Sequence, residues 1–587
     1  MRSFSMRLSS RLRRLVAAAA IVPLSILAGC ASPPSAEELA VRCPALADTA
    51  ATATVAASSI GLPSGAASIT SAVLVAALPG SASGNAYTPA TPQYCRVQGR
   101  IAPIDPAAQT IHFQFNLPTQ WNAKALQYGG GGFNGTLITG LAPLRDAAPG
   151  DPLPLMRGYA TFGTDSGHQA AAFPASEPGA FALNDEMLEN FAFASYKKVR
   201  DVAAEVMRRY YGRMPARVYY FGGSEGGREG LAMAQRFPLD YDGVVSVVPV
   251  INWTGLFHAF VRNQVPQFSD WLDAGKAPLI AKSVAEACDG LDGLVDGVIN
   301  NYLACQARVN LQPLRCADGA DAGPQCLSDA ELALLHSVQS PYTFSFPLAN
   351  GITSYPPWWW GHEDSLDGAS VPSLVRWLSG TAAPTVPPNA ASAATQWLYG
   401  SNWIRYAIVR DAGFDVRSYR PEAFAARVQQ TSALMDATSP NLSAFFARGG
   451  KLIIRENAAD RAQSPLMGIA YHQALVARFG QAEVDRSVRL YVSPSSTHTG
   501  NAQTVPTAAP AGAAEKRPVP TMAELLDPLD RWVTGGTAPA DAIEQTSKAA
   551  LPPFEVRASR PMCRYPAYPH YKGGDRLAAA SFECRAP

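Results

Sequence analysis

The chain has 587 residues, which is too many for one hydrophobic core, so we expect a large main domain with a sizeable insertion. Lysine and arginine total 48, aspartate and glutamate total 47, and the net charge at pH 7 is +1. Charged residues make up only 16% of the chain. This balance argues against nucleic acid or an acidic polymer as a partner.

The first thirty residues have the pattern of an export signal. Five arginines (Arg2, Arg7, Arg11, Arg13 and Arg14) precede an apolar run at 15–27 that is too short to span a bilayer. The segment ends in Leu27-Ala28-Gly29-Cys30, which is similar to the lipobox of bacterial lipoproteins. We therefore predict a periplasmic or outer-membrane protein whose one membrane anchor is a lipid on Cys30. The alternative is an ordinary secretory signal with a chance cysteine.

The cysteines point to an oxidising compartment. Of the nine cysteines, eight remain when Cys30 is set aside, and an even number in an exported chain predicts four disulfides. Spacing alone does not fix the pairing, but joining nearest neighbours gives Cys43–Cys95, Cys288–Cys305, Cys316–Cys326 and Cys563–Cys584. No two cysteines have C-x-x-C spacing, which argues against a thiolate zinc site.

The composition changes along the exported chain. Residues 31–90 are rich in Ala, Ser, Thr and Pro and predict a weakly structured tether that leads into the domain edge. Residues 91–250 alternate apolar strands with helices, which predicts a largely parallel sheet. The predicted strands are 96–104 and 110–117 as a hairpin, then 125–128, 159–165 and 241–249, and the predicted helix is 190–210.

The composition and the predicted secondary structure change near residue 251. Eight tryptophans cluster in residues 251–450, and Pro/Ala loops interrupt the helices. We interpret this segment as a lid inserted into the main domain, with aromatic side chains suited to an aryl-bearing substrate. For most of these tryptophans, packing inside the lid itself is the simpler expectation. Strands at 451–454 and 486–492 then return the chain to the second part of the core, 451–587.

The segment 217–236 carries the strongest functional pattern. A β-branched and aromatic run leads into Gly222-Gly223-Ser224-Glu225-Gly226, and a helical pattern follows. A strand, a sharp G-x-S-x-G turn and a helix form the nucleophile elbow of α/β-hydrolases, in which the serine backbone is strained. The amide of Glu225, at the helix start, can face a developing oxyanion. The alternative is a glycine-rich turn without catalytic function.

A second glycine cluster follows the predicted strand 125–128. Glycines at 129–132 would let backbone amides approach a ligand, as in the loop that supplies the other oxyanion donor of α/β-hydrolases. Gly132 is the first candidate and Gly131 the second, and a flexible hinge is the alternative.

A serine hydroxyl needs a histidine to accept its proton and a carboxylate to orient that histidine. In α/β-hydrolases the acid and the histidine follow the serine in the chain, on loops after strands. Asp460 is the first candidate for the acid and Glu456, closer to the strand end, is the second. His498 lies in a small-residue loop directly after the strand 486–492, whereas His168 precedes the serine and is expected to be structural.

Residues 288–300 place three aspartates among glycines. Asp289, Asp292 and Asp296 offer hard oxygen ligands of the kind that Ca²⁺ prefers, although the loop lacks the glutamate that completes an EF-hand. A Cys288–Cys305 bridge would clamp this loop. We expect a structural ion, and the alternative is a solvated acidic turn.

These motifs together resemble the tannase and feruloyl esterase family of α/β-hydrolases. The resemblance is carried by GGGGFNG at 129–135, TDSGH at 164–168, YYFGGSEGGREG at 219–230, QRFPLDYDGVV at 235–245, CDGLDGLVDGVINNYLAC at 288–305 and RPMCRYPAYPHYKGGD at 560–575. It implies an α/β-hydrolase fold with a large inserted lid and a triad of Ser224, Asp460 and His498. It also implies an oxyanion hole from the amides of Gly132 and Glu225.

The resemblance extends to the ion, because it implies Ca²⁺ held by the side chains of Asp289, Asp292 and Asp296 and the carbonyls of Leu294 and Val298. Two departures stand out. Gly223 and Thr499 occupy places where the family commonly has a bridged pair of cysteines, so we expect packing to keep the two loops rigid. The residues before Asp460 also lack the usual His-Gly approach.

The function that these features imply is a serine esterase that cleaves small aromatic esters of the feruloyl or galloyl type through an acyl-enzyme. Hydrolysis of mono(2-hydroxyethyl) terephthalate is an alternative. Family members that act on this half-ester bind its carboxylate with an arginine, and Arg405 is near the corresponding place but does not evidently match it. A second alternative is a catalytically silent lipoprotein that binds aromatic compounds. The oligomeric state is not predicted.

Overall fold

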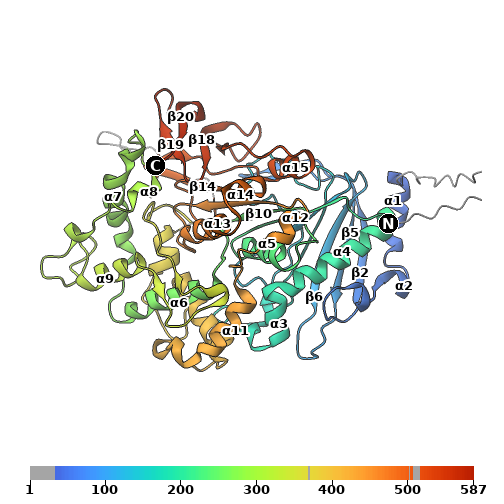
Figure 1. Ribbon diagram of the computed structural model, residues 1–587, viewed down its shortest axis with the longest axis horizontal. Coiled ribbons are helices and arrows are strands. Elements are labelled where there is room, and N and C mark those ends of the chain that lie inside the picture. Colours follow the sequence, from blue (N-terminus) through green and yellow to red (C-terminus); the bar gives the residue numbers. More distant parts are fainter. Residues whose placement is uncertain (1–33, 368–370, 501–502, 507–515) are drawn as a thin grey trace, which may run out of the picture.

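A twelve-stranded sheet runs through the centre of the molecule (Figure 1). The computed structural model describes residues 34–367, 371–500, 503–506 and 516–587. In spatial order the strands are β1 (Thr54–Val55), β2 (Ala67–Val75), β5 (Tyr94–Ile101), β6 (Ile111–Pro118), β8 (Ala160–Thr164), β7 (Lys124–Tyr128), β9 (Arg217–Gly223), β10 (Gly243–Val247), β13 (Lys451–Asn457), β14 (Val488–Ser493), β18 (Val556–Arg564) and β17 (Ala542–Lys548).

The sheet is parallel in its centre and antiparallel on both flanks. The six strands from β8 to β14 pair in parallel, as predicted, whereas the N-terminal and C-terminal strands pair antiparallel. Burial explains the difference. Every residue of β10 is buried, as in a strand covered on both faces, while β2 alternates between buried and exposed residues at its start. A largely parallel sheet is therefore confirmed only for the central strands.

Helices cover both faces of the central strands. Alternate side chains of β9 point to opposite faces, so Tyr219 and Phe221 pack with α15 while Tyr220 lies in the core on the α5 side. The helices are α1 (Ala36–Ala45), α2 (Ala50–Ala53), α3 (Asp185–Glu189), α4 (Ser195–Tyr211), α5 (Glu225–Arg236), α6 (Trp253–Gln264), α7 (Ala277–Cys288), α8 (Tyr302–Cys305), α9 (Asp329–Val338), α10 (Thr395–Asn402), α11 (Ala425–Met435), α12 (Ser443–Ala447), α13 (Leu466–Phe479), α14 (Gln481–Ser487) and α15 (Leu526–Gly535).

Between β10 and β13 the described residues form α6 to α12 and one short strand pair, and none of them adds a strand to the main sheet. In Figure 1 much of this green-to-orange segment gathers beside the sheet, away from the N-terminal strands. Trp358, Trp397 and Trp403 are among the largest fully buried side chains of the molecule. Seven of the eight tryptophans of this segment are buried, as expected for packing, although five of the seven also line cavities.

Residues 36–75 are better ordered than the composition predicts. They form α1, α2, β1 and β2, and Leu39 and Val55 join the hydrophobic core. A disulfide also ties Cys43 of α1 to Cys95 of β5. The prediction of a weakly structured segment is therefore wrong for these residues, because small apolar side chains and one covalent link suffice to hold them at the edge of the sheet. Cys30 lies outside the described residues.

Four further strand pairs stand apart from the main sheet: β3 (Ser81–Ser83) with β4 (Ala86–Thr88), β11 (Tyr342–Thr343) with β12 (Ser354–Tyr355), β15 (Gln503–Pro506) with β16 (Lys516–Val519), and β19 (Tyr568–Tyr571) with β20 (Phe582–Arg585). The last pair brings Cys584 to Cys563 of β18.

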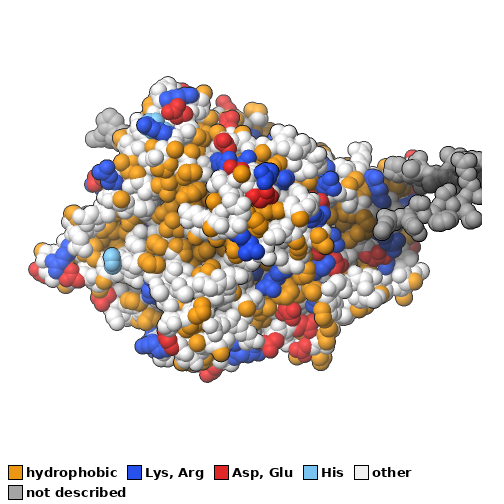
Figure 2. All heavy atoms as spheres, viewed as in Figure 1, with side chains coloured by type: hydrophobic (Ala, Val, Ile, Leu, Met, Phe, Trp, Pro, Cys, Tyr) orange, Lys and Arg blue, Asp and Glu red, His pale blue; other side chains and the backbone are white. Residues whose placement is uncertain are grey.

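All eight cysteines after Cys30 are joined, and the four disulfides have the predicted partners. Such a set is consistent with an exported protein. Within the described residues, no helix is both long and apolar enough to cross a bilayer. Positive and negative side chains are interspersed on the face shown in Figure 2, in keeping with the near-zero net charge.

Candidate active site

Ser224 lies in the sharp turn that the sequence predicts. β9 ends at Gly223, α5 begins at Glu225, and Ser224 between them has φ 61° and ψ −122°, a strained backbone for a residue with a side chain. A Cβ atom on Gly222 would approach the carbonyl oxygen of Gly226 to 2.2 Å. The strand and the helix can meet this closely only if position 222 has no side chain, so the glycines are a steric requirement of the turn.

Ser224, His498 and Asp460 are brought together. The Nε2 atom of His498 lies 2.9 Å from the Ser224 hydroxyl, and its Nδ1 atom lies 2.6 Å from Oδ2 of Asp460. The other oxygen of Asp460 accepts hydrogen bonds from the amides of Ala462 and Gln463 at 2.7 and 3.0 Å. Because the carboxylate is fixed by these amides, it can hold the imidazole in the orientation that a general base needs.

The second candidate for the acid, Glu456, does not contact the histidine. β13 continues to Asn457, so Glu456 is a strand residue, fully buried, and its Oε2 accepts a hydrogen bond from Gln463 at 2.7 Å. Burial and the neighbouring charge of Asp460 raise the pKa of Glu456 well above its usual value. Both effects favour the protonated form, which suits a structural hydrogen-bonding role.

Gly132 and Glu225 line the same cavity as Ser224. Glu225 is the first residue of α5, and the first amides of a helix have no partner within the helix. Gly132 has φ 61°, a left-handed conformation that glycine adopts without strain. Both candidates for oxyanion donors thus border the cavity that contains Ser224, and Gly131 is absent from the cavity lining.

One buried carboxylate connects the glycine loop to α5. Glu229 accepts hydrogen bonds from the amide of Gly130 at 3.0 Å and from the side chain of Asn134 at 2.6 Å. The hydroxyl of Tyr220 donates to the same carboxylate. The loop that carries Gly132 is therefore fixed to the helix that begins at Glu225.

The cavity at Ser224 encloses about 30 Å³. It is lined by Gly132, Ser224, Glu225, Val250, Trp253, Leu256, Phe257, Phe260, Trp377, Tyr399 and Ala462. Its walls are mainly aromatic, and the single ionisable carboxylate among these residues, that of Glu225, is bound by Arg228 Nε at 2.8–2.9 Å. Among the described residues, the lining thus offers no cation to a negatively charged substrate group.

Sequence reasoning missed a contact between the inserted segment and His498. The Trp377 ring lies edge-on to the imidazole, with centroids 5.2 Å apart, and its indole nitrogen donates to Asp367 at 2.5 Å. Asp367 also accepts from the amide of Thr499 at 2.9 Å. Burial opposes ionisation of Asp367, but His498 and these hydrogen bonds outweigh it and lower its pKa. No local motif marks Asp367, because Thr499, its partner in the His498 loop, lies 132 residues further along the chain.

Two other sequence candidates lie outside the site. His168 stacks on Phe181 with centroids 3.9 Å apart, and burial lowers its pKa to about 4, as expected for a structural histidine. Arg405 donates to the carbonyl of Ala412 at 2.8 Å and lies 3.5 Å from Glu177. It does not line the cavity at Ser224.

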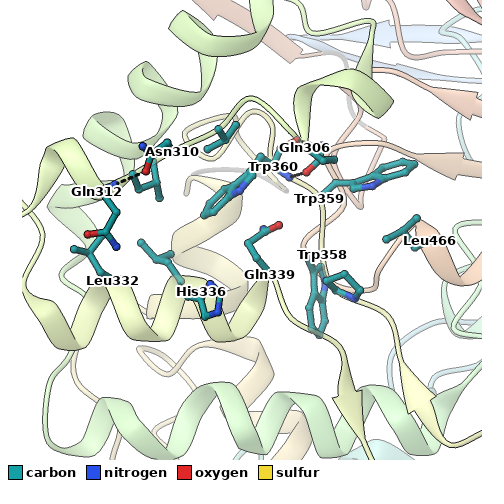
Figure 3. Close-up of a pocket in the computed structure, with 14 residues that line it drawn as sticks. Gln306, Asn310, Gln312, Leu332, His336, Gln339, Trp358, Trp359, Trp360 and Leu466 are labelled. Atoms are coloured by element: carbon teal, nitrogen blue, oxygen red, sulfur yellow. Dashed lines mark hydrogen bonds between the residues drawn. The ribbon is translucent and has the colours of Figure 1, made fainter. Parts of the chain in front are cut away.

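A larger cavity of about 420 Å³ lies between the inserted segment and Leu466, the first residue of α13 (Figure 3). Its lining includes three consecutive tryptophans, Trp358 to Trp360, together with His336 and Gln339. Ser224, Asp460 and His498 do not line this cavity. It offers no activated nucleophile, so the smaller cavity is the candidate site of chemistry.

The aspartates of the acidic loop are partly satisfied by the protein itself. The amide of Gly297 donates to Asp289 at 2.8 Å, and Arg560 donates to Asp296 at 2.9 Å. Burial raises the pKa of Asp292 to about 7. Among the described residues, no three acidic, histidine or cysteine side chains are placed to hold a metal ion together. The donor chemistry fits a hard cation only if backbone carbonyls contribute.

Comparison with known proteins identifies the family of the chain. The sequence model of the family "Tannase and feruloyl esterase" matches residues 95–585. The chain belongs to the tannase and feruloyl esterase family. An uncharacterised esterase of Agrobacterium fabrum is 34% identical to it over 92% of this chain and 93% of the relative. Mono(2-hydroxyethyl) terephthalate hydrolase of Piscinibacter sakaiensis is 31% identical over 88% of each chain.

Solved structures of family members have the same fold. Feruloyl esterase B from Aspergillus oryzae superposes with a TM-score of 0.71 and 22% identity, covering 93% of this chain and 100% of that one. Tannin acyl hydrolase from Aspergillus niger gives a TM-score of 0.62 and 18% identity over 89% and 92% of the two chains. These likenesses establish the α/β-hydrolase fold.

One expectation drawn from the family resemblance needs correction. The loops around Ser224 and His498 were expected to depend on packing alone, because positions 223 and 499 are glycine and threonine. The chain nevertheless forms four disulfides, and Cys563, which pairs with Val492 of β14 just before the His498 loop, is bonded to Cys584. A disulfide therefore braces β18, the strand that pairs with β14, so the His498 loop is not supported by packing alone.

The two candidate acids can be separated by isosteric substitution. Asp460→Asn should lower kcat by about 10²- to 10⁴-fold, because the imidazole loses the carboxylate that fixes its tautomer. Glu456→Gln should keep kcat within about threefold, since an amide resembles the protonated acid that burial favours. Hydrolysis of an aryl ester measures both. A larger loss for Glu456→Gln than for Asp460→Asn would reverse the assignment.

Proposed function

We propose that the protein is a serine carboxylic-ester hydrolase that cleaves small aromatic esters through an acyl-enzyme on Ser224. The observation that carries this proposal is the hydrogen-bonded series from Asp460 through His498 to the Ser224 hydroxyl. A serine in a strained turn with an oriented imidazole is the arrangement that activates a hydroxyl for attack on a carbonyl.

The mechanism follows from the positions of the three side chains. Ser224 Oγ attacks the ester carbonyl while His498 Nε2 takes its proton, and Asp460 stabilises the imidazolium that forms. The amides of Gly132 and Glu225 would stabilise the oxyanion of the tetrahedral intermediate. His498 then protonates the leaving alcohol, and water attacks the acyl-enzyme with His498 again as the base.

An aromatic and uncharged acyl group suits the cavity best. Aromatic side chains such as Trp253, Phe257 and Trp377 surround Ser224, which favours a planar aryl group of the feruloyl or galloyl type. A relative of 30% identity over 80% of this chain is named a probable feruloyl esterase of Arthroderma benhamiae. Hydrolysis of a terephthalate half-ester is the weaker alternative, because Arg405 is engaged elsewhere and the cavity lining has no arginine or lysine.

We interpret residues 251–450 as the lid of this site. The cavity volume of about 30 Å³ exceeds that of one water molecule only slightly and is far below the roughly 300 Å³ of a typical ligand pocket. Trp253, Phe257, Phe260, Trp377 and Tyr399, which close it, all belong to the inserted segment. An aryl ester therefore reaches Ser224 only when these side chains separate.

A rate panel tests the proposed function. The protein should hydrolyse methyl ferulate or methyl gallate with a kcat/KM at least about tenfold above that for mono(2-hydroxyethyl) terephthalate, since only the last carries a charge that the cavity leaves unpaired. Ser224→Ala should abolish all of these activities. If the wild type hydrolyses none of these esters and Ser224 in the native protein does not react with a fluorophosphonate probe, a silent aromatic-binding lipoprotein becomes the better explanation.

We also propose a structural Ca²⁺ in the loop that Cys288–Cys305 closes, held by Asp289, Asp292 and Asp296 with the carbonyls of Leu294 and Val298. The buried carboxylates of Asp289 and Asp292, with their hard oxygen atoms, support this proposal. The three aspartates are not placed to hold an ion together in this structure, so binding would have to draw them closer. An ion at this loop would stabilise the inserted segment and take no part in the reaction, because none of its ligands lines the cavity at Ser224.

Removal of the ion is measured by thermal unfolding. EDTA should lower the Tm by several degrees, and excess Ca²⁺ should restore it, because a ligand that binds only the folded state stabilises it. Asp292→Asn should have a lower Tm that no longer responds to EDTA. A wild-type Tm that is the same with EDTA and with Ca²⁺ would refute the ion site.

We further propose that the exported protein is anchored by a lipid on Cys30, which the lipobox-like segment supports. Full-length protein expressed in a Gram-negative bacterium should sediment with membranes and dissolve in detergent. Cys30→Ser should shift it to the soluble fraction, because a signal without the cysteine leaves no site for the lipid. Equal partitioning of the two proteins would contradict the anchor.

A further inference from the structure

Arg145 lies outside the strands and loops that carry the three reacting residues, yet it contacts two of those loops. It belongs to the connection between β7 and β8. Its guanidinium donates a hydrogen bond to the carbonyl oxygen of His498, a residue 353 positions later in the chain. The backbone that receives this bond is the one from which the imidazole projects toward Ser224.

The same side chain packs against the residue before the nucleophile. A Cβ atom built on Gly223 would lie 2.1 Å from Cδ of Arg145 and 2.7 Å from Nε. All three of the nearest atoms to that Cβ position belong to Arg145. Arg145 therefore fills the space between the Ser224 turn and the His498 backbone, and the absence of a side chain at position 223 makes this possible.

The neighbouring residue anchors this arrangement. Asp146 forms an ion pair with Arg455 at 3.1 Å, and both side chains are almost fully buried. Arg455 is a residue of β13, the strand that leads to Asp460, and it also donates to the carbonyl of Thr521 at 2.7 Å. A buried ion pair of this kind is costly to break, so it fixes the loop that carries Arg145.

A second route from β13 reaches the His498 loop from its other side. Arg455 Nε donates to the side chain of Asn457 at 3.1 Å, and Asn457 donates to the carbonyl of Thr497 at 2.8 Å. The loop after β14 has no regular structure from 494 to 500. A backbone hydrogen bond from Ala459 to the carbonyl of Ser496, at 3.1 Å, holds one part of it. Side chains hold the next two carbonyls, with Asn457 on that of Thr497 and Arg145 on that of His498.

We propose that Arg145 is a positioning residue for His498. It sets the distance between the imidazole and the Ser224 hydroxyl by bridging the His498 backbone and Gly223, while the Asp146–Arg455 ion pair holds its own loop in place. This role rests on the proposed function, since it assigns Arg145 an effect on the base of that reaction. Arg145 is not among the residues that line the cavity at Ser224.

The test separates positioning from simple stabilisation. Arg145→Met keeps an unbranched hydrocarbon chain against Gly223 but removes the donor to His498. We expect kcat for an aryl ester to fall about tenfold or more while KM changes by less than about twofold, because the cavity lining is untouched. Labelling of Ser224 by a fluorophosphonate should slow in parallel, and Arg145→Lys should recover part of the loss by restoring a cationic donor.

Arg157→Met is the matched control. Arg157 is also a largely buried arginine between β7 and β8, and it pairs with Glu524 and Asp527 at 3.1 and 2.6 Å, away from the reacting residues. The Arg157→Met substitution should lower the Tm without lowering kcat. A wild-type kcat in Arg145→Met, or an equal loss of kcat in Arg157→Met, would overturn the positioning role.

A second experiment needs no enzymatic activity. Gly223→Ala should lower the Tm strongly in the wild type, since its Cβ would collide with Arg145, and much less in an Arg145→Ala background, where the space is vacated. Additive losses would overturn the packing contact. This comparison tests the Arg145 contact even if the wild type hydrolyses none of the esters. Such a failure would refute the proposed function without refuting the contact between Arg145 and Gly223.

Discussion

The contact between His498 Nε2 and Ser224 Oγ, at 2.9 Å, is the interaction on which the site depends, and it joins residues 274 positions apart. The sheet makes it possible. β9, β10, β13 and β14 are neighbours and run in parallel, so their carboxyl ends meet at one edge. The loops that follow β9, β13 and β14 carry the serine, the acid and the histidine, and the sheet geometry brings these loops together before any side chain contributes.

How much of this the sequence could reveal depended on whether each signal was local. The elbow could be predicted because strand, glycines and helix are consecutive and each residue type has a steric reason. His498 could be predicted because it follows a strand directly. The choice between Glu456 and Asp460 was less secure, because it depended on where β13 ends, and strand ends are poorly defined by propensity. The structure extends that strand to Asn457 and so places Glu456 within it.

Other parts of the site had no sequence signal at all. Arg145 and Asp367 contact the His498 loop across long stretches of chain, and neither lies in a motif. The order of residues 36–75 was missed for a related reason, because Ala- and Ser-rich sequences resemble linkers until a tertiary partner such as Cys95 is known. Of the antiparallel flanks, only the hairpin of β5 and β6 was anticipated. The rest was not, since burial on one face or on both decides the pairing and emerges only in the assembled fold.

The pairing of β10 with β13 also bears on how the chain folds. Val247 lies beside Arg455, across the whole inserted segment, and contacts so distant in sequence form slowly because a long loop must close first. The turn at Ser224 can form early because its strand and helix are adjacent in the chain. His498 reaches Ser224 only after β13 and β14 have joined the sheet. A nascent or partly translocated chain therefore carries an inert hydroxyl, and reactivity appears only when the C-terminal strands have docked.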